Sequence, residues 1–130
     1  MITKNSLILR DLDILQEMAK KNLCMVYLSM NSLTEATRLK LEPRTATAKE
    51  RLRTIETLSK AGIPTGAMCA PIIPGLTDHE IPAVLQAVSE HGAKWANYTI
   101  VRLNGQLAEL FKDWLTHTYP DRASKILHQI

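Results

Sequence analysis

Short apolar runs alternate with longer amphipathic stretches along the chain. The apolar runs cover residues 23–30, 65–70 and 95–101, and their near-continuous hydrophobic character favours strands buried on both faces. A shorter run at residues 2–5 predicts the end of a further strand. In the stretches between, apolar residues recur every three or four positions, which predicts helices. The predicted helices span residues 11–20, 34–41, 47–62, 77–92, 106–116 and 121–129.

Two of these helices carry a start signal. Thr47 and Glu50 have the spacing of a capping box, in which a hydroxyl and a carboxylate reciprocally satisfy free backbone N–H groups. Thr77 and Glu80 repeat that spacing and predict a second capping box. Pro43 stops the short helix at residues 34–41, because the residue before a proline is biased away from helical geometry.

The order of elements predicts the fold class. Strands separated by helical crossovers of this length run parallel, with right-handed connections. We therefore predict an α/β fold in which about four parallel strands with covering helices form a partial parallel (β/α) barrel. No linker or repeat interrupts residues 1–130, which we expect to be a single domain. Four strands leave open edges and the chain opens in mid-element, so we expect it to be part of a larger unit. By itself we expect it to self-associate through its open edges.

Composition narrows the class of protein only slightly. A hydrophobic content of 45% with 22% charged residues is ordinary for a soluble globular protein. The net charge of +3 permits contact with an anion without demanding nucleic acid. Cys24 and Cys69 are far apart and fit neither a metal motif nor a disulfide framework, so we expect reduced thiols in a cytoplasmic protein. No apolar run reaches about 18 residues, so we expect no membrane-spanning helix.

Polar residues gather where the predicted strands end, which is where parallel α/β folds bind ligands. Lys4 is placed to bind a carboxylate, or is simply solvated. Ser29 ends an apolar strand, where its hydroxyl faces a ligand or caps the next turn. Arg102 binds an anion or pairs with Glu109. This rim suits a ligand with a carboxylate and a sugar better than it suits a metal ion. The other polar residues at the predicted strand ends include Thr3, Asn5, Asn31, Ser32, Thr99 and Asn104.

The segment 71–75 is the most distinctive turn of the chain. Two prolines stiffen it, and Gly75 permits a positive φ or a close approach to a ligand. Exposed backbone groups on such a turn can bind a flat base, although Pro-Gly turns before helices are common in purely structural roles. The chain has no nucleophile elbow, glycine-rich phosphate loop or zinc motif, and its four histidines lack ligand spacing. We therefore expect no catalytic residue and no metal ligand among these 130 residues.

Six segments in order resemble one family. They are residues 2–6 (ITKNS), 26–31 (VYLSMN), 41–44 (LEPR), 62–64 (GIP), 70–78 (APIIPGLTD) and 100–103 (IVRL). The chain resembles radical S-adenosylmethionine (SAM) proteins of the spore photoproduct lyase-like, or "DNA repair photolyase", group over essentially its whole length. The resemblance implies a lyase-like enzyme on a (β/α)6 TIM-like barrel. Three cysteines in a C-x-x-x-C-x-x-C loop hold its [4Fe–4S] cluster, and reductive cleavage of SAM yields a 5′-deoxyadenosyl radical.

By this resemblance the chain supplies the C-terminal part of such a barrel. Lys4 then meets the methionyl carboxylate of SAM, Ser29 faces its methionyl or ribose part, and the backbone of residues 71–73 (Pro71, Ile72 and Ile73) contacts adenine. The remaining rim residues, facing cofactor or substrate, are Asn5, Asn31, Arg44 and Arg102. The sequence has no C-x-x-x-C-x-x-C, which Cys24 and Cys69 cannot replace. We therefore expect this chain alone to be inactive, to bind no cofactor tightly, and to need an N-terminal barrel segment as partner.

Two other interpretations stay open. One is a non-catalytic module that binds a nucleoside-like ligand or SAM at the strand ends. The other is a fragment of an ordinary barrel lyase that acts through acid–base groups, against which the shortage of carboxylates at the strand ends argues. The family name does not establish DNA repair, and no basic stretch interleaved with aromatic residues indicates a nucleic-acid surface.

Overall fold

A single sheet of four parallel strands organises the computed structural model, which describes all residues 1–130. The strands β1 (Ile2–Thr3), β2 (Val26–Ser29), β3 (Thr65–Ile72) and β4 (Trp95–Ile100) lie in the order β1-β2-β3-β4. The helices are α1 (Leu12–Lys20), α2 (Glu35–Leu41), α3 (Ala48–Lys60), α4 (Ile81–Glu90), α5 (Gln106–Thr118) and α6 (Ala123–Gln129), with 3-10 helices η1 (Ser6–Asp11) and η2 (Asp78–Glu80). Sequential parallel strands with flanking helices confirm the α/β fold and are consistent with a partial barrel.

The main core lies between the sheet and the helices along it. Val26, Leu28 and Met30 are fully buried there, because alternate residues of a strand point to the same face. Ile55 and Leu58 of α3 and Val84 and Val88 of α4 pack into the same cluster. On the other face the ring of Tyr27 lies against Gly66, where a Cβ atom would come within 2.5 Å of the ring. Glycine is therefore required at that point of β3.

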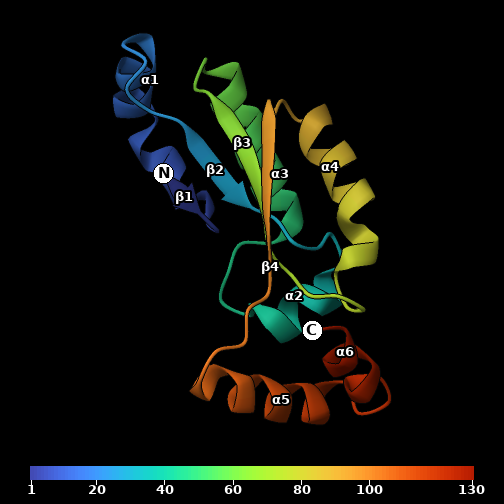
Figure 1. Cartoon of the computed structure of the whole chain (residues 1–130). Coiled ribbons are helices and arrows are strands. Elements are labelled where there is room, and N and C mark those ends of the chain that lie inside the picture. Colours follow the sequence, from blue (N-terminus) through green and yellow to red (C-terminus); the bar gives the residue numbers. More distant parts are fainter.

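Helices α2, α5 and α6 lie beyond the carboxyl ends of the strands (Figure 1). There Ile73 and Leu76, in the loop after β3, form a second buried cluster with three residues of α5 and α6: Leu115, Ala123 and Ile126. Arg122 donates a hydrogen bond of 2.8 Å from Nη2 to the carbonyl of Gly75. The C-terminal pair of helices thus holds the loop that the sequence marks as a ligand-binding turn.

Of the two predicted capping boxes, one is confirmed and one is wrong. Thr47 Oγ1 accepts from the N–H of Glu50, whose carboxylate accepts from the N–H of Thr47 at 2.8 Å. At the second site the Thr77 hydroxyl instead accepts from the N–H of Ile73. The Glu80 carboxylate reaches across to the loop after β2, where it accepts from the Ser32 hydroxyl at 2.8 Å and from two backbone N–H groups. Three donors of another loop hold Glu80 more strongly than one free N–H of its own helix would.

Element boundaries differ modestly from expectation. β2 begins at Val26, and Leu23, predicted to lie in this strand, is 66% exposed. Asn22 has a φ of 56°, so the chain turns sharply there and leaves the helix before the strand can start. The segment before α1 forms the 3-10 helix η1, which the helical spacing did not predict. The run at residues 95–101 was expected to be a strand buried on both faces, and this is wrong: all six residues of β4 are exposed, because β4 is an edge strand.

Candidate functional site

The carboxyl ends of β1, β2 and β3 meet at one edge of the sheet, because all three strands are parallel. In the register of β1 and β2, Thr3 pairs with Leu28, so that Lys4 and Ser29 come next in the two chains. Ser29 pairs with Met68 of β3 in turn. The structure therefore brings together the first two predicted ligand contacts, which are 25 residues apart in the sequence.

A buried ion-pair network lies under this edge. Arg51, at the start of α3, is 2% exposed and donates to the carbonyl of Ser29 at 2.8 Å and to that of Ala46 at 2.9 Å. Its Nη2 also lies 2.8 Å from Oε2 of Glu42, and it donates to the hydroxyl of Thr45. The other carboxylate oxygen of Glu42, Oε1, lies 3.4 Å from Nζ of Lys4. The predicted carboxylate clamp is thus one member of a chain of charges, Lys4–Glu42–Arg51.

Glu42 is the centre of that network. Its side chain is only 8% exposed, and burial by itself opposes ionisation. The hydrogen bond and charge of Arg51, with the charge of Lys4, outweigh burial and hold the pKa of Glu42 below its ordinary value. Oε1 is nevertheless buried without a hydrogen-bond partner and faces only the Lys4 ammonium. The carboxylate is therefore ionised at neutral pH and has one oxygen fixed by Arg51.

Ser29 and Asn31 are nine-tenths or more buried, with 5% and 7% of their surfaces exposed. Arg51 binds the carbonyl of Ser29, and the buried side-chain atom that lacks a hydrogen-bond partner is Oε1 of Glu42. Ser32, by contrast, is held by Glu80. Two largely buried polar side chains at the carboxyl ends of parallel strands can face a ligand at this edge.

The turn after β3 is already occupied by internal bonds. Ile73 is 2% exposed; its N–H donates to the Thr77 hydroxyl and its carbonyl accepts from the N–H groups of Leu76 and Thr77. The carbonyl of Ile72 accepts from the N–H of Val101. Gly75 adopts a φ of 76°, the positive value its position was expected to need, and its N–H donates to Asp78. The turn is thus a firm edge of the site, with few of its backbone groups free.

The three remaining predicted rim residues lie apart from this network. The Asn5 side chain caps η1 by accepting from the N–H of Leu7 at 3.0 Å. Arg44 is exposed in the loop between α2 and α3. Arg102 is exposed just after β4, forms no ion pair with Glu109, and lines a groove of about 460 Å³ with the end of α6. The structure therefore places Lys4, Ser29 and Asn31 at one edge and leaves the two arginines at its margin.

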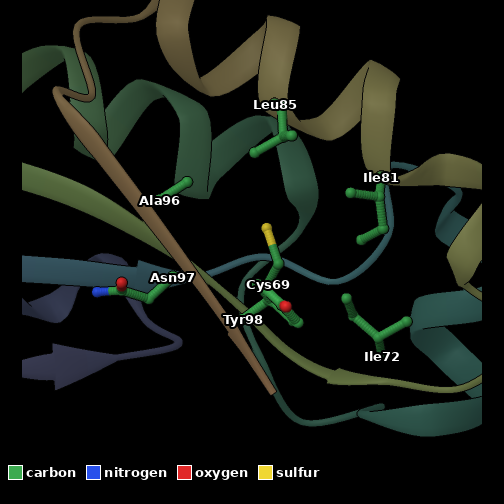
Figure 2. Close-up of a pocket in the computed structure, with 7 residues that line it drawn as sticks. All are labelled: Cys69, Ile72, Ile81, Leu85, Ala96, Asn97 and Tyr98. Carbon is green, nitrogen blue, oxygen red and sulfur yellow. The ribbon is translucent and has the colours of Figure 1, made fainter. Parts of the chain in front are cut away.

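An apolar groove of about 370 Å³ lies elsewhere, between β4 and α4 (Figure 2). Leu85 and Ile81 project from α4 toward Cys69. Burial raises the pKa of the Cys69 thiol. A protonated thiol among alkyl groups offers no acid, base or anion-binding group. Of the predicted site residues only Ile72 lines it; the lining residues are Cys69, Ile72, Ile81, Leu85, Ala96, Asn97 and Tyr98.

No group of three or more His, Cys, Asp or Glu side chains is placed to hold a metal ion. Cys69 lies in the main core, and Cys24 donates from Sγ to the carbonyl of Leu15 at 3.4 Å. No helix is both long and apolar enough to cross a membrane.

The polar strand-end edge on sequential parallel strands accords with the comparisons to known proteins. The family model of the radical SAM superfamily matches residues 1–88, which is more than half of the chain. The chain belongs to the radical SAM superfamily. The match runs from β1 to α4 and contains the edge formed by Lys4, Ser29 and Asn31.

Curated relatives in mycobacteria are longer than this chain. The uncharacterized protein Rv2578c of Mycobacterium tuberculosis (strain ATCC 25618 / H37Rv) is 28% identical over 126 residues, which cover 95% of this chain and 37% of that protein. The uncharacterized protein Mb2609c of Mycobacterium bovis matches with the same figures. The chain thus spans little more than a third of the length of these relatives. No solved structure matches it significantly.

The radical SAM superfamily in general uses SAM and an iron–sulfur cluster, and the residues present fit only the first. An ammonium, a hydroxyl and an amide at one edge match the carboxylate and ribose of SAM in chemistry, whereas the backbone groups of Ile73 are already bonded within the chain. A cluster would need three thiolates together. The chain has only two cysteines, Cys24 and Cys69, and no group of three metal-binding side chains, so residues 1–130 do not fit a cluster.

Glu42, Arg51 and Glu80 organise the edge and were not predicted in these roles. The sequence did carry a signal for Arg51, because it stands four and seven residues before Ile55 and Leu58 on the buried stripe of α3. A charged residue on a buried stripe needs a partner, and Glu42 is the acid that the preceding loop offers. Glu80 had no such signal, because its partners are one hydroxyl and two backbone N–H groups of a loop 46–48 residues away.

Proposed function

We propose that this chain forms the SAM-binding edge of a radical SAM enzyme. The observation that carries the proposal is the placement of two largely buried polar side chains, Ser29 and Asn31, at the strand-end edge that also holds the Lys4 ammonium. Lys4 binds the methionyl carboxylate, Ser29 and Asn31 bind the methionyl or ribose part, and the 71–73 turn supports the adenine. Arg44 and Arg102 face the substrate from the margin, and Asn5 holds η1 beside Lys4.

The whole protein, on this proposal, cleaves SAM reductively to a 5′-deoxyadenosyl radical, as expected of the spore photoproduct lyase-like group. The segment described here does not carry out that reaction alone, because it has no place for the cluster. It acts with a preceding barrel segment that completes the sheet beyond β1. Anaerobic incubation of the 130-residue chain with SAM and dithionite should release no 5′-deoxyadenosine above the buffer blank, and release would contradict this assignment.

A titration of the chain with SAM tests the binding edge. Without a cluster to anchor the amino acid, we expect weak binding, with a Kd of roughly 0.1–1 mM, which corresponds to about −5.5 to −4 kcal/mol. Asn31→Ala should weaken it severalfold, because a buried amide is lost from the ligand's surroundings. Gln86→Ala, which removes an exposed amide of α4 outside the edge, is the matched control. No saturable binding, or equal effects of the two variants, would contradict the proposal.

The alternative of a non-catalytic SAM-binding module is distinguished by affinity. A module that binds SAM for its own sake would reach a low-micromolar Kd without any cluster. The acid–base barrel lyase is disfavoured for a structural reason: the two carboxylates nearest the edge, Glu42 and Glu80, are both committed to internal partners.

A further inference from the structure

We propose that Glu42 is a positioning residue that holds the Lys4 ammonium at the carboxyl edge of the sheet, where Lys4 binds the carboxylate of SAM. This inference rests on the proposed function and adds a residue to it. Glu42 does not touch the ligand, since its Oε1 is buried and faces Lys4. Any effect of Glu42 on binding must therefore pass through Lys4.

Glu42 is itself held rigidly. Arg51 fixes Oε2 at 2.8 Å and is fixed in turn by the carbonyls of Ser29 and Ala46. The N–H of Ala46 also donates to the carbonyl of Lys4, at 3.2 Å, which ties the Lys4 backbone to the same loop. The backbone and the ammonium of Lys4 thus both contact one loop, and the side chain stays 42% exposed, so that the ammonium can still meet a ligand.

The charges leave this cluster able to attract an anion. Lys4 and Arg51 each carry +1 and Glu42 carries −1, so the three side chains sum to +1. The Arg51 guanidinium is 3% exposed and saturated with acceptors, whereas the Lys4 side chain is 42% exposed. The excess positive charge is therefore presented to solvent at Lys4 alone. The ion pair keeps the ammonium within 3.4 Å of Glu42 rather than free in solvent, which lowers the ordering cost on binding.

Decarboxylated SAM separates this role from a general structural one, because it lacks only the carboxylate. The 130-residue chain is titrated with SAM and with decarboxylated SAM, and chemical shifts report each Kd. Wild type should prefer SAM by about three- to tenfold, the range of one charge-assisted contact that is partly exposed. Lys4→Met should abolish the preference, and Lys20→Met, an exposed lysine of α1, should retain it.

Glu42→Gln is the decisive variant. We expect it to reduce the preference for SAM at least twofold while the Kd for decarboxylated SAM changes little. Equal loss of both ligands would mean that Glu42 only supports the fold, and an unchanged preference would mean that Lys4 needs no positioning; either overturns the inference. Equal binding of both ligands by wild type overturns it as well but leaves the SAM-binding edge standing. Failure to bind either ligand overturns the proposed function with it.

A second measurement applies if Glu42→Gln does not fold. The titration of the Glu42 carboxyl, followed by carbon NMR in wild type and Lys4→Met, reports the pairing directly. Arg51 and Lys4 are the charged side chains that face this carboxyl group. Arg38 donates a hydrogen bond to the backbone carbonyl of Glu42. Removal of Lys4 should raise the pKa of Glu42, and an unchanged pKa would overturn the inference.

Discussion

At the scale of single residues, buried charges define the ligand edge more than exposed ones do. Arg51 satisfies two backbone carbonyls, a hydroxyl and a carboxylate from a position inside the protein. Removing one partner of a buried ion pair is costly, because the other charge stays buried without compensation. Arg51→Met should therefore lower the free energy of unfolding by about 3–5 kcal/mol. Arg53 is an exposed arginine of the same helix, and Arg53→Met should change the free energy of unfolding by less than about 0.5 kcal/mol. Urea unfolding of the two variants provides the comparison.

Glu80 makes the stability of the protein depend on pH. Burial opposes its ionisation, but hydrogen bonds from Leu33, Ser32 and Thr34 outweigh it and hold the pKa of Glu80 below its ordinary value. The folded-state pKa is lower than the unfolded one, so the stabilisation is complete above about pH 4.5 and is lost as the pH falls through the folded-state pKa.

Glu80→Gln should accordingly cost about 1–2 kcal/mol at pH 7 and flatten the fall in stability below about pH 4.5. Thermal unfolding between pH 7 and 3 measures both effects, with Glu109→Gln, an exposed acid of α5, as control. If the stability of Glu80→Gln falls as steeply below about pH 4.5 as that of wild type, this role of Glu80 is contradicted.

At the scale of elements, the packing of α5 and α6 beyond the strand ends positions the turn after β3. Leu115 is fully buried against that turn, whereas Leu110 of the same helix is 68% exposed. Leu115→Ala should cost about 2–5 kcal/mol. Leu110→Ala should cost less than about 0.5 kcal/mol. Hydrogen exchange should show faster opening of the amides of Ile73 and Thr77 in Leu115→Ala only, and unchanged exchange there would contradict the role of the helix pair.

The type and order of the elements follow from local patterns, whereas the site depends on contacts between distant loops. The β–α order was predictable because apolar runs and helical spacing are properties of neighbouring residues. The Thr47 capping box is equally local and was correct. The apparent box at Thr77 failed because Glu80 binds a loop 46–48 residues earlier, a pairing that no local pattern contains. The same holds for Lys4 and Glu42, which meet only after β1 and the loop after α2 are brought together.

At the scale of the whole molecule, the sheet ends in an open strand. All six residues of β4 are exposed, and Tyr98 and Ile100 show 69% and 53% of their surfaces. Unpaired strand edges with apolar side chains promote association. We therefore expect the chain to self-associate with increasing concentration, and Tyr98→Lys to shift it toward monomer in light scattering. A wild-type chain that stays monomeric at high concentration would contradict this expectation.

Binding of SAM at the strand-end edge can be observed directly from the amide chemical shifts of the 130-residue chain as SAM is added. Saturable shifts should concentrate at Lys4 and Asn5, at Ser29 to Asn31, and at Ile72 and Ile73, and Lys4→Met should weaken them. Shifts that concentrate instead along the apolar groove between β4 and α4, or no saturable shifts at all, would contradict it.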